Sequence, residues 1–189
     1  TPGPYTTLFR SGRREAVAEL GPIVAQVQAR LAGKAETLGL RYVSSVAAEG
    51  QPLPKDDVDI AHQFQLRLRE RAREEQARGT TLSGPHRDDL ELLLDGRPAR
   101  LFASQGQQRS IALSLKLAEV QFLTAKLGES PVLLLDDVLS ELDLERQAHR
   151  LSLLDEHVQT SVTSTHASEL AYKPGQVLDV AGGTVSQRG

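Results

Sequence analysis

Two adjacent carboxylates follow a short apolar run in the second half of the chain. Asp136 and Asp137 come directly after the run 131–135, whose length and lack of polar alternation predict a strand buried on both faces. Neighbouring carboxylates are costly there unless they meet a cation or hydrogen-bond donors. Mg²⁺ suits the position, because it takes oxygen ligands and shares them with phosphate. The alternative is that the two acids only begin a turn or cap a helix expected from Ser140.

A second candidate lies upstream, where small residues open a long amphipathic helix. Ser104 and Gly106 stand at the expected helix start, where free backbone N–H groups and the helix dipole favour an anion. Such a loop can hold a phosphate group, and it can equally be an ordinary N-cap. The apolar spacing predicts the helix over 107–127, and Gly128 is expected to end it.

Taken in order, these stretches resemble the motifs of the ABC-type ATPases of DNA repair. Residues 104–108 (SQGQQ) resemble the signature motif, 133–137 (LLLDD) the Walker B motif and 140–143 (SELD) the D-loop. Residues 84–89 (GPHRDD) resemble a segment that marks RecF, the bacterial family of recombination mediators. The motif-bearing stretch covers roughly residues 80–166, so the chain resembles the C-terminal part of RecF.

The resemblance implies a role for each matched residue at an ATP site shared by two subunits. Asp136 would hold Mg²⁺, Asp137 would be the general base for the attacking water, and His166 would be the switch residue. Asp137 stands where the wider superfamily usually has Glu, and its shorter side chain implies slow hydrolysis. The residues that would reach the opposite subunit or its ATP are Ser104, Gln105, Gly106, Gln107 and Asp143.

One expected motif is missing from the sequence. No Gly-x-x-x-x-Gly-Lys-Ser/Thr phosphate loop occurs in it. In the family that loop lies N-terminal to everything present here, so the chain is expected to be part of a longer protein whose N-terminal P-loop lobe is missing. Binding of ATP and Mg²⁺ would require that lobe. We therefore expect a weak ATPase in the full-length protein and an inactive chain in isolation.

The element pattern predicts an α/β fold with a mostly helical arm at residues 1–79. The resemblance implies that residues 80–189 form the C-terminal lobe of an ABC-type P-loop ATPase head. In the arm, helices are expected over about 11–38 and 56–77, and Pro22 predicts a kink or break in the first. Further expected elements are strands at 41–46, 80–83 and 158–165, helices at 140–154 and 167–172, and hairpins 90–94/97–102 and 177–180/184–185.

Basic residues of the second expected helix and of the RecF-like segment are candidates for DNA binding. They are Arg67, Arg71, Arg78, His86 and Arg87. These side chains could follow a phosphate backbone. The alternatives are a solvated face of ion pairs, as Glu74 four residues before Arg78 indicates, and a structural knot of charge-assisted hydrogen bonds at 86–88. The net charge of −3 gives no independent support for DNA binding.

Composition sets further limits. The chain has 189 residues, enough for one or two domains, and 39% of them are hydrophobic, which can fill a core. It has no Cys, which excludes disulfides and thiolate metal sites and fits a reducing compartment. No apolar run approaches the ~20 residues that span a bilayer, and no signal peptide is evident. We therefore expect a cytoplasmic protein without a membrane partner, and the resemblance implies that it is associated with the nucleoid.

By resemblance, the function would be ATP-gated dimerisation on DNA during recombinational repair. The expected substrates are gapped duplexes or single/double-strand junctions, and the expected partners are RecR and RecO, which act with RecF in loading RecA. A structural chromosome-associated head, as in SMC proteins or RecN, would need long heptads that the helices before Gly79 do not offer. An ABC transporter subunit would carry a Gly-rich signature and Glu after the Walker B Asp. A non-enzymatic docking module is a further alternative.

Overall fold

The computed structural model describes residues 4–32, 36–47, 53–136, 158–164 and 175–188. It divides into two compact units, Thr1–Phe122 and Leu123–Gly189. The described chain contains both long helices and small sheets, as the predicted α/β fold class requires. The boundary between the units differs from the arm boundary at Gly79, which stays a prediction. The helices predicted at 140–154 and 167–172 lie outside the described residues.

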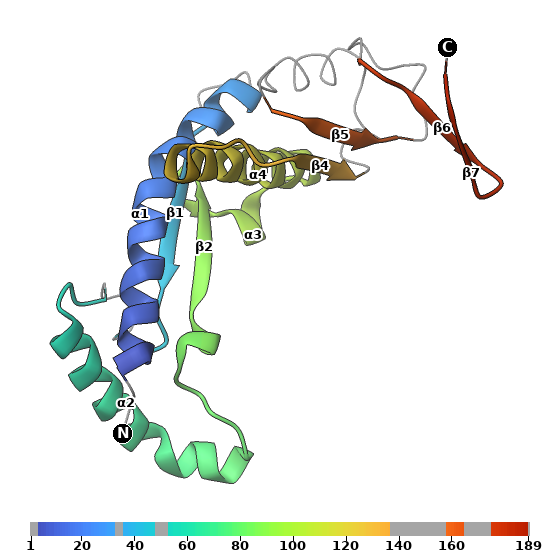
Figure 1. Cartoon of the computed structure of the whole chain (residues 1–189). Coiled ribbons are helices and arrows are strands. Elements are labelled where there is room, and N and C mark those ends of the chain that lie inside the picture. Colours follow the sequence, from blue (N-terminus) through green and yellow to red (C-terminus); the bar gives the residue numbers. More distant parts are fainter. Residues whose placement is uncertain (1–3, 33–35, 48–52, 137–157, 165–174, 189) are drawn as a thin grey trace. The chain divides into compact units, whose positions relative to one another are not determined.

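The first unit is built around helix α1, Pro4–Ala32, which runs alongside strand β1, Leu38–Val43 (Figure 1). Val24, Val27 and Leu31 recur at helical spacing and are buried. The helix is continuous through Pro22, so the predicted break is not observed. The predicted helix end was also wrong. Leu38 begins a strand because it pairs with β2 and is only 1% exposed, so tertiary pairing overrides the helical pattern.

Strand β2, Asp89–Leu94, lies antiparallel to β1, with Leu38 opposite Leu94. The predicted Asp95-Gly96 turn is confirmed, because both residues have positive φ, 50° and 77°, as a type I′ turn requires. The second arm of this hairpin was predicted too long. Strand β3 covers only Arg97–Pro98, and helix α3, Ala99–Phe102, follows it. Pro98 has no N–H for a ladder, and its φ of −55° suits a helix start.

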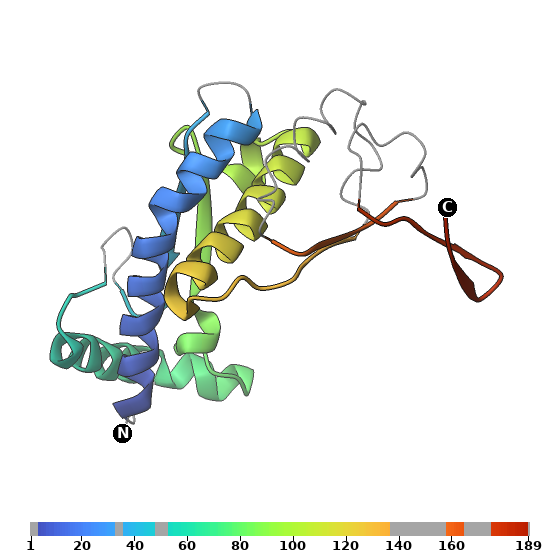
Figure 2. The same cartoon turned by 45° about the horizontal axis from the view of Figure 1, so that its top comes forward.

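Helix α2, Asp57–Arg78, begins and ends close to where the sequence predicts (Figure 2). The Asp56 side chain accepts a hydrogen bond from the Val58 N–H at 2.6 Å, and Gly79 closes the helix in the left-handed conformation. The strand predicted over 80–83 is absent. The N–H groups of Leu82 and Ser83 bind the Glu75 carboxylate at 2.7 and 3.2 Å instead of a neighbouring strand.

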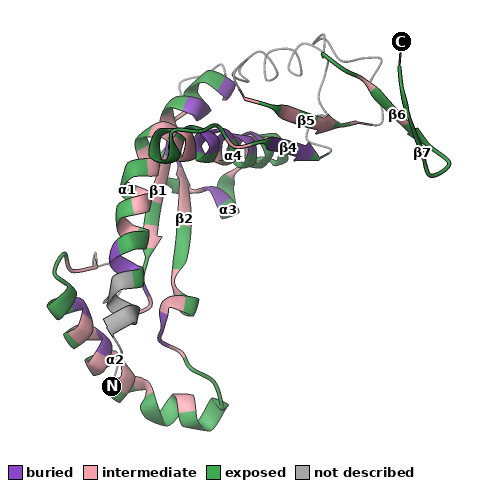
Figure 3. Ribbon diagram, in the orientation of Figure 1, coloured by how far each residue is buried: buried purple, intermediate pink, exposed green. Residues whose placement is uncertain are grey.

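Helix α4, Gln105–Leu127, follows α3 and ends at Gly128, as predicted. Its buried side includes Ile111, Leu117 and Ala118, and buried turns of α1, α2 and α4 are purple in Figure 3. Ser114 of α4 donates a hydrogen bond of 2.6 Å to Gln28 of α1, and both side chains are fully buried. This contact joins α4 to α1 inside the first unit.

The second unit contains two small sheets. Strand β4, Leu133–Asp136, is parallel to β5, Thr160–Thr163, and β6, Leu178–Ala181, forms a hairpin with β7, Thr184–Gln187. The prediction that the β4 run is covered on both faces was wrong. Leu133 and Leu135 are buried, but Leu134 is 72% exposed. In the described part of the chain only β5 pairs with β4, and an apolar run alone does not specify what covers its second face.

Among the described residues, no helix is long and apolar enough to cross a membrane.

Candidate functional site

The predicted signature residues lie at the exposed start of α4. Ser104 and Gln107 form a reciprocal pair of hydrogen bonds. The Ser104 N–H donates to Gln107 Oε1 at 2.8 Å, and the Gln107 N–H donates to Ser104 Oγ at 3.3 Å. This is a capping box, which satisfies two of the N–H groups that a helix start leaves without a partner. The ordinary N-cap that the sequence allowed is therefore present, and its geometry fixes the start of the motif.

The Gln107 side chain continues into a polar network that leads to the core. Its Nε2 donates to Glu36 Oε1 at 3.1 Å, and the other oxygen of Glu36 accepts from Gln28 Nε2 at 3.0 Å. Gln28 in turn accepts from the Ser114 hydroxyl. The network joins the signature motif to α1 through residues that no motif singles out.

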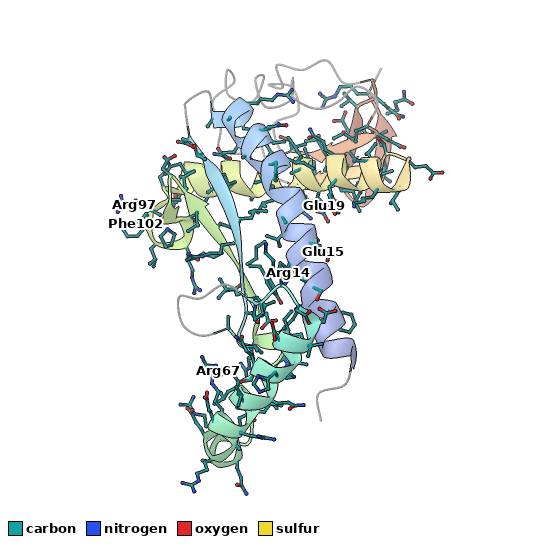
Figure 4. All side chains as sticks on the ribbon, turned by 90° about the vertical axis from the view of Figure 1, so that its left-hand side faces the viewer. Arg14, Glu15, Glu19, Arg67, Arg97 and Phe102 are labelled. Carbon is teal, nitrogen blue, oxygen red and sulfur yellow. The ribbon has the colours of Figure 1, made fainter. Side chains whose placement is uncertain are left out.

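The residues between Ser104 and Gln107 are open to solvent. Gln105 and Gly106 are exposed, and a Cβ added at Gly106 would meet no atom within 4 Å. Packing in the described structure therefore does not require glycine at that position. Just before the motif, the Arg97 guanidinium lies 3.8 Å from the centre of the Phe102 ring. Both residues are labelled in Figure 4. This cation–π contact holds the exposed Phe102 at the edge of the motif.

Asp136 lies at the carboxyl end of β4 and is exposed. It accepts a hydrogen bond from the hydroxyl of Thr163, its register partner on β5. The parallel pairing of β4 with β5 brings both side chains to the strand ends, where ligands of α/β sheets bind. No group of three His, Cys, Asp or Glu in the described ranges could enclose a metal ion. Asp137, Asp143 and His166 lie outside those ranges, so their roles stay predictions.

Asp88 of the RecF-like segment directs its carboxylate into the interior of the first unit. Asp88 forms an ion pair with Arg10 of α1, Nε to Oδ2 at 2.9 Å, and both side chains are fully buried. Asp88 also accepts from the Tyr42 hydroxyl at 2.6 Å and from the Ser45 N–H at 2.8 Å. On its other side Arg10 lies 4.6 Å from the centre of the Phe64 ring of α2. One acid therefore joins α1, the strand β1 and the segment after it, while its partner Arg10 contacts α2.

These contacts change how the buried groups titrate. Burial by itself raises the pKa of Asp88, but hydrogen bonds from Arg10, Tyr42 and Ser45 outweigh it and leave that pKa below its usual value. Burial raises the pKa of Tyr42 to about 12, together with its hydrogen bond to Asp88 and the negative charge there. Asp88 is therefore ionised and Tyr42 neutral at physiological pH.

The two predicted DNA-binding residues of this segment are exposed and bound to the preceding loop. His86 Nε2 lies 2.8 Å from Thr81 Oγ1, and Arg87 Nε donates to the Thr81 carbonyl at 2.9 Å. A Cβ added at Gly84 would lie 2.5 Å from His86 Cε1, so a side chain there would displace the imidazole. The knot foreseen among residues 86–88 does not form as such, because His86 and Arg87 bind the loop before them while Asp88 binds Arg10. Exposure leaves His86 and Arg87 accessible to a ligand as well.

The arginines of α2 fall into two kinds. Arg71 Nη1 donates to the Leu82 carbonyl at 3.0 Å, and Arg67, labelled in Figure 4, reaches the Val46 carbonyl at 3.4 Å. Both therefore hold loops of the protein itself. Arg78 is 62% exposed and pairs with Glu74 across one helical turn, as the sequence predicts.

Sequence reasoning missed the capping box and three buried or partly buried polar residues that hold the first unit together. The spacing Ser104-x-x-Gln107 is a capping-box pattern and could have been found. Glu36, Gln28 and Arg10 carried no such signal, because their partners lie 71, 86 and 78 residues away in the chain.

The chain is similar in sequence to proteins named RecF. No family model matches the chain. The DNA replication and repair protein RecF of Cyanothece sp. is 41% identical over 177 residues, covering 92% of this chain and 46% of that protein. RecF of Heliobacterium modesticaldum is 45% identical over 166 residues, covering 87% and 43%.

Solved structures agree with the sequence matches. A structure of the recombination mediator protein RecF-ATPrS in the RecFOR pathway matches with a TM-score of 0.81 and 30% identity, covering 97% of this chain and 47% of that one. A structure of RecF-ATP in the same pathway matches with a TM-score of 0.79 and 27% identity, covering 98% and 48%. The chain spans about half the length of the RecF proteins it matches. On sequence and fold together, the chain belongs to the RecF family and corresponds to the C-terminal part of such a protein.

Proposed function

We propose that this chain is the signature-bearing part of an ATP-dependent DNA-repair protein that dimerises around ATP. The observation that carries the proposal is the exposed start of α4, where Ser104, Gln105 and Gly106 face solvent and no packing fills the space beside Gly106. A solvent-facing helix start with a hydroxyl and backbone N–H groups fits a phosphate. The similar RecF structures are named for their ATP and ATPrS complexes, which supports a nucleotide as the ligand.

The capping box decides which donors can serve the phosphate. Ser104 Oγ accepts from the Gln107 N–H, so the hydrogen of its own hydroxyl remains to be donated outward. Gly106 lets an oxygen approach the backbone closely, because it carries no Cβ. In the proposed dimer these groups would bind the γ-phosphate of ATP held by the opposite subunit. Gln105 and Gln107 would frame that contact, and Asp143 would meet the partner subunit.

The residues after β4 would serve the ATP bound in their own subunit. Asp136 fits a Mg²⁺ site with water between, because it is exposed at a strand end and the Thr163 hydroxyl leaves it further lone pairs. Mg²⁺ would neutralise phosphate charge when bound. Asp137 would act as general base and His166 as the switch residue. The P-loop lobe needed to hold ATP would come from the remaining half of the protein, and hydrolysis would be slow.

We further propose that the whole protein acts on DNA in recombinational repair. The RecF relatives are named DNA replication and repair proteins, and the similar structures are described as part of the RecFOR pathway. Gapped duplexes or single/double-strand junctions would be its substrates, RecR and RecO its partners, and the bacterial cytoplasm and nucleoid its location. Of the five predicted DNA-binding residues, Arg78, His86 and Arg87 are best suited to DNA phosphates, because they are exposed while Arg67 and Arg71 are engaged with backbone carbonyls.

The test is Ser104→Arg in the full-length protein. An arginine at the start of α4 would fill the space of the incoming phosphate, so we expect ATP-driven dimerisation to be lost, while ATP binding by each monomer is retained. Light scattering with and without ATP measures the first, and equilibrium binding of a fluorescent ATP analogue the second. Gln121→Arg adds the same charge on an exposed turn of α4 and is expected to dimerise normally. Unchanged dimerisation of Ser104→Arg would refute the trans role.

A further inference from the structure

We propose that Glu36 is a positioning residue of the signature motif. Its carboxylate fixes the orientation of the Gln107 amide and, through that amide, the Ser104 backbone. The inference rests on the proposed role of Ser104 at the ATP of the opposite subunit. Glu36 lies outside every recognised motif and is 71 residues from Gln107 in sequence.

The geometry is a continuous chain of hydrogen bonds from the core to the surface. Ser114 and Gln28 are fully buried and joined at 2.6 Å, and Gln28 donates to Glu36 Oε2 at 3.0 Å. Glu36 Oε1 then accepts from Gln107 Nε2 at 3.1 Å. Gln107 Oε1 accepts the Ser104 N–H at 2.8 Å. The buried end is fixed by packing, so the exposed end is held as well.

The order of donors and acceptors follows from the carboxylate. An ionised carboxylate only accepts, so both glutamines must turn their NH₂ groups toward Glu36. Gln107 is thereby obliged to turn its Oε1 toward the Ser104 N–H. The reverse orientation of this amide would set an NH₂ group against that N–H and break the capping box.

This orientation selects the group that faces the phosphate. With its N–H bound to Gln107, Ser104 presents its hydroxyl to an incoming anion and not its backbone. Because Gln107 lies between Glu36 and Ser104, the carboxylate charge stays behind an amide, away from the phosphate. Loss of Glu36 would free Gln107 to rotate and would allow the Ser104 N–H to exchange its partner for water.

Hydrogen exchange distinguishes a positioning role from a merely structural link between α1 and α4, because it reports on the hydrogen bond of the Ser104 amide alone. In the full-length protein, Glu36→Ala is expected to speed hydrogen exchange of the Ser104 amide about tenfold. A hydrogen bond to a charged group, such as that from Gln107 to Glu36, changes an equilibrium constant by roughly ten- to a hundredfold. Exchange along the remainder of α4 should be unchanged. ATP-driven dimerisation should weaken by a similar factor, with ATP binding by the monomer retained.

Conservative variants separate orientation from charge. Glu36→Gln keeps an oxygen for Gln107, provided that Gln28 turns over and the Ser114 hydroxyl becomes the acceptor, so it is expected to restore near-normal dimerisation. Glu36→Asp keeps the charge but is too short to reach Gln107, so it should also show faster exchange of the Ser104 amide and weaker dimerisation. It provides the test if the alanine variant folds poorly. Glu119→Ala removes an exposed carboxylate paired with Lys116 on the same helix, and is the matched control, with no expected change.

A double-mutant cycle completes the test. If Glu36 acts through Gln107, adding Glu36→Ala to Gln107→Ala should cause no further loss of dimerisation. Additive losses, or faster exchange along all of α4, would overturn the inference and leave a structural link. Normal Ser104 exchange and dimerisation in Glu36→Ala, alongside a defective Ser104→Arg, would refute the positioning role alone. A normal Ser104→Arg would refute the proposed function instead.

Discussion

Arg10 and Asp88 form an ion pair of 2.9 Å with neither side chain exposed. They are 78 residues apart in sequence, and the pair links α1 to the end of the RecF-like segment within the first unit. Tyr42 and Ser45 supply further hydrogen bonds to the carboxylate. A buried charge pair of this kind does not by itself make a fold more stable than an apolar core, but breaking it leaves an unpaired buried charge. The pair therefore makes the segment a determinant of folding.

Removing the acid should be strongly destabilising. We expect Asp88→Ala to lower the free energy of unfolding by about 3–5 kcal/mol, because Arg10 is left buried without its counter-charge. Urea unfolding followed by circular dichroism measures this. The control is Glu91→Gln, which breaks the more exposed pair with Arg41 and should cost less than about 1 kcal/mol. Equal effects of the two substitutions would contradict the central role of Asp88.

The same carboxylate predicts an acid dependence of stability. The pKa of Asp88 is lower in the folded protein than in the unfolded chain, so its stabilising contribution is fully present above the unfolded pKa, near 3.9. That contribution is lost as pH falls through the lower, folded pKa. The difference in unfolding free energy between the parent protein and Asp88→Asn, measured from pH 6 down to 3, should therefore begin to shrink below about pH 4. A constant difference across that range would argue against this assignment.

Gly106 offers a way to separate stability from function. A Cβ there has open space, and alanine is the better helix former, so Gly106→Ala should be neutral or stabilising by up to about 1 kcal/mol. In the proposed dimer the added methyl group would meet the incoming phosphate, so ATP-driven dimerisation should fall. Thermal unfolding and light scattering on the same sample check both. A variant that is more stable and fully able to dimerise would contradict close phosphate approach at this glycine.

The two kinds of arginine on α2 should respond differently to alanine. Arg71→Ala removes the donor that holds the Leu82 carbonyl and should lower the melting temperature. Arg78→Ala removes only an exposed ion pair and should change stability by less than about 1 kcal/mol.

DNA binding distinguishes them further. If Arg78 contacts a phosphate, Arg78→Ala should weaken binding to gapped duplex. The slope of the logarithm of the binding constant against the logarithm of the salt concentration should become shallower by about one. Binding titrations between low and moderate salt measure this slope. An unchanged slope would exclude Arg78 from the DNA surface, and the exposed His86 and Arg87 would be the next positions to substitute.

Local chemistry made several elements of this fold predictable. The cap at Asp56, the left-handed Gly79 and the Asp95-Gly96 turn each follow from residue types, and the helix after Ser104 ends at Gly128 as predicted. The errors arose where distant groups decide the structure. Residues 80–83 looked like a strand, but the Glu75 carboxylate binds two of their N–H groups.

The candidate site was predictable to a similar extent. Motif spacing indicated Ser104 and Gly106, and both lie at an exposed helix start. Glu36 could not have been found, because nothing near it in sequence announces a partner on α4. The same holds for Arg10, whose role depends on a carboxylate brought to it by the fold. Assignments to Asp137, Asp143 and His166 stay predictions.

The burial of Asp88 bears on how loss-of-function alleles should be interpreted. A substitution there would reduce the amount of intact protein in the cell, since unfolded chains are removed by proteases. Its phenotype would resemble loss of activity and yet reveal nothing about nucleotide or DNA. Protein abundance should therefore be measured before any mutation in residues 84–89 is attributed to a defect in catalysis or binding.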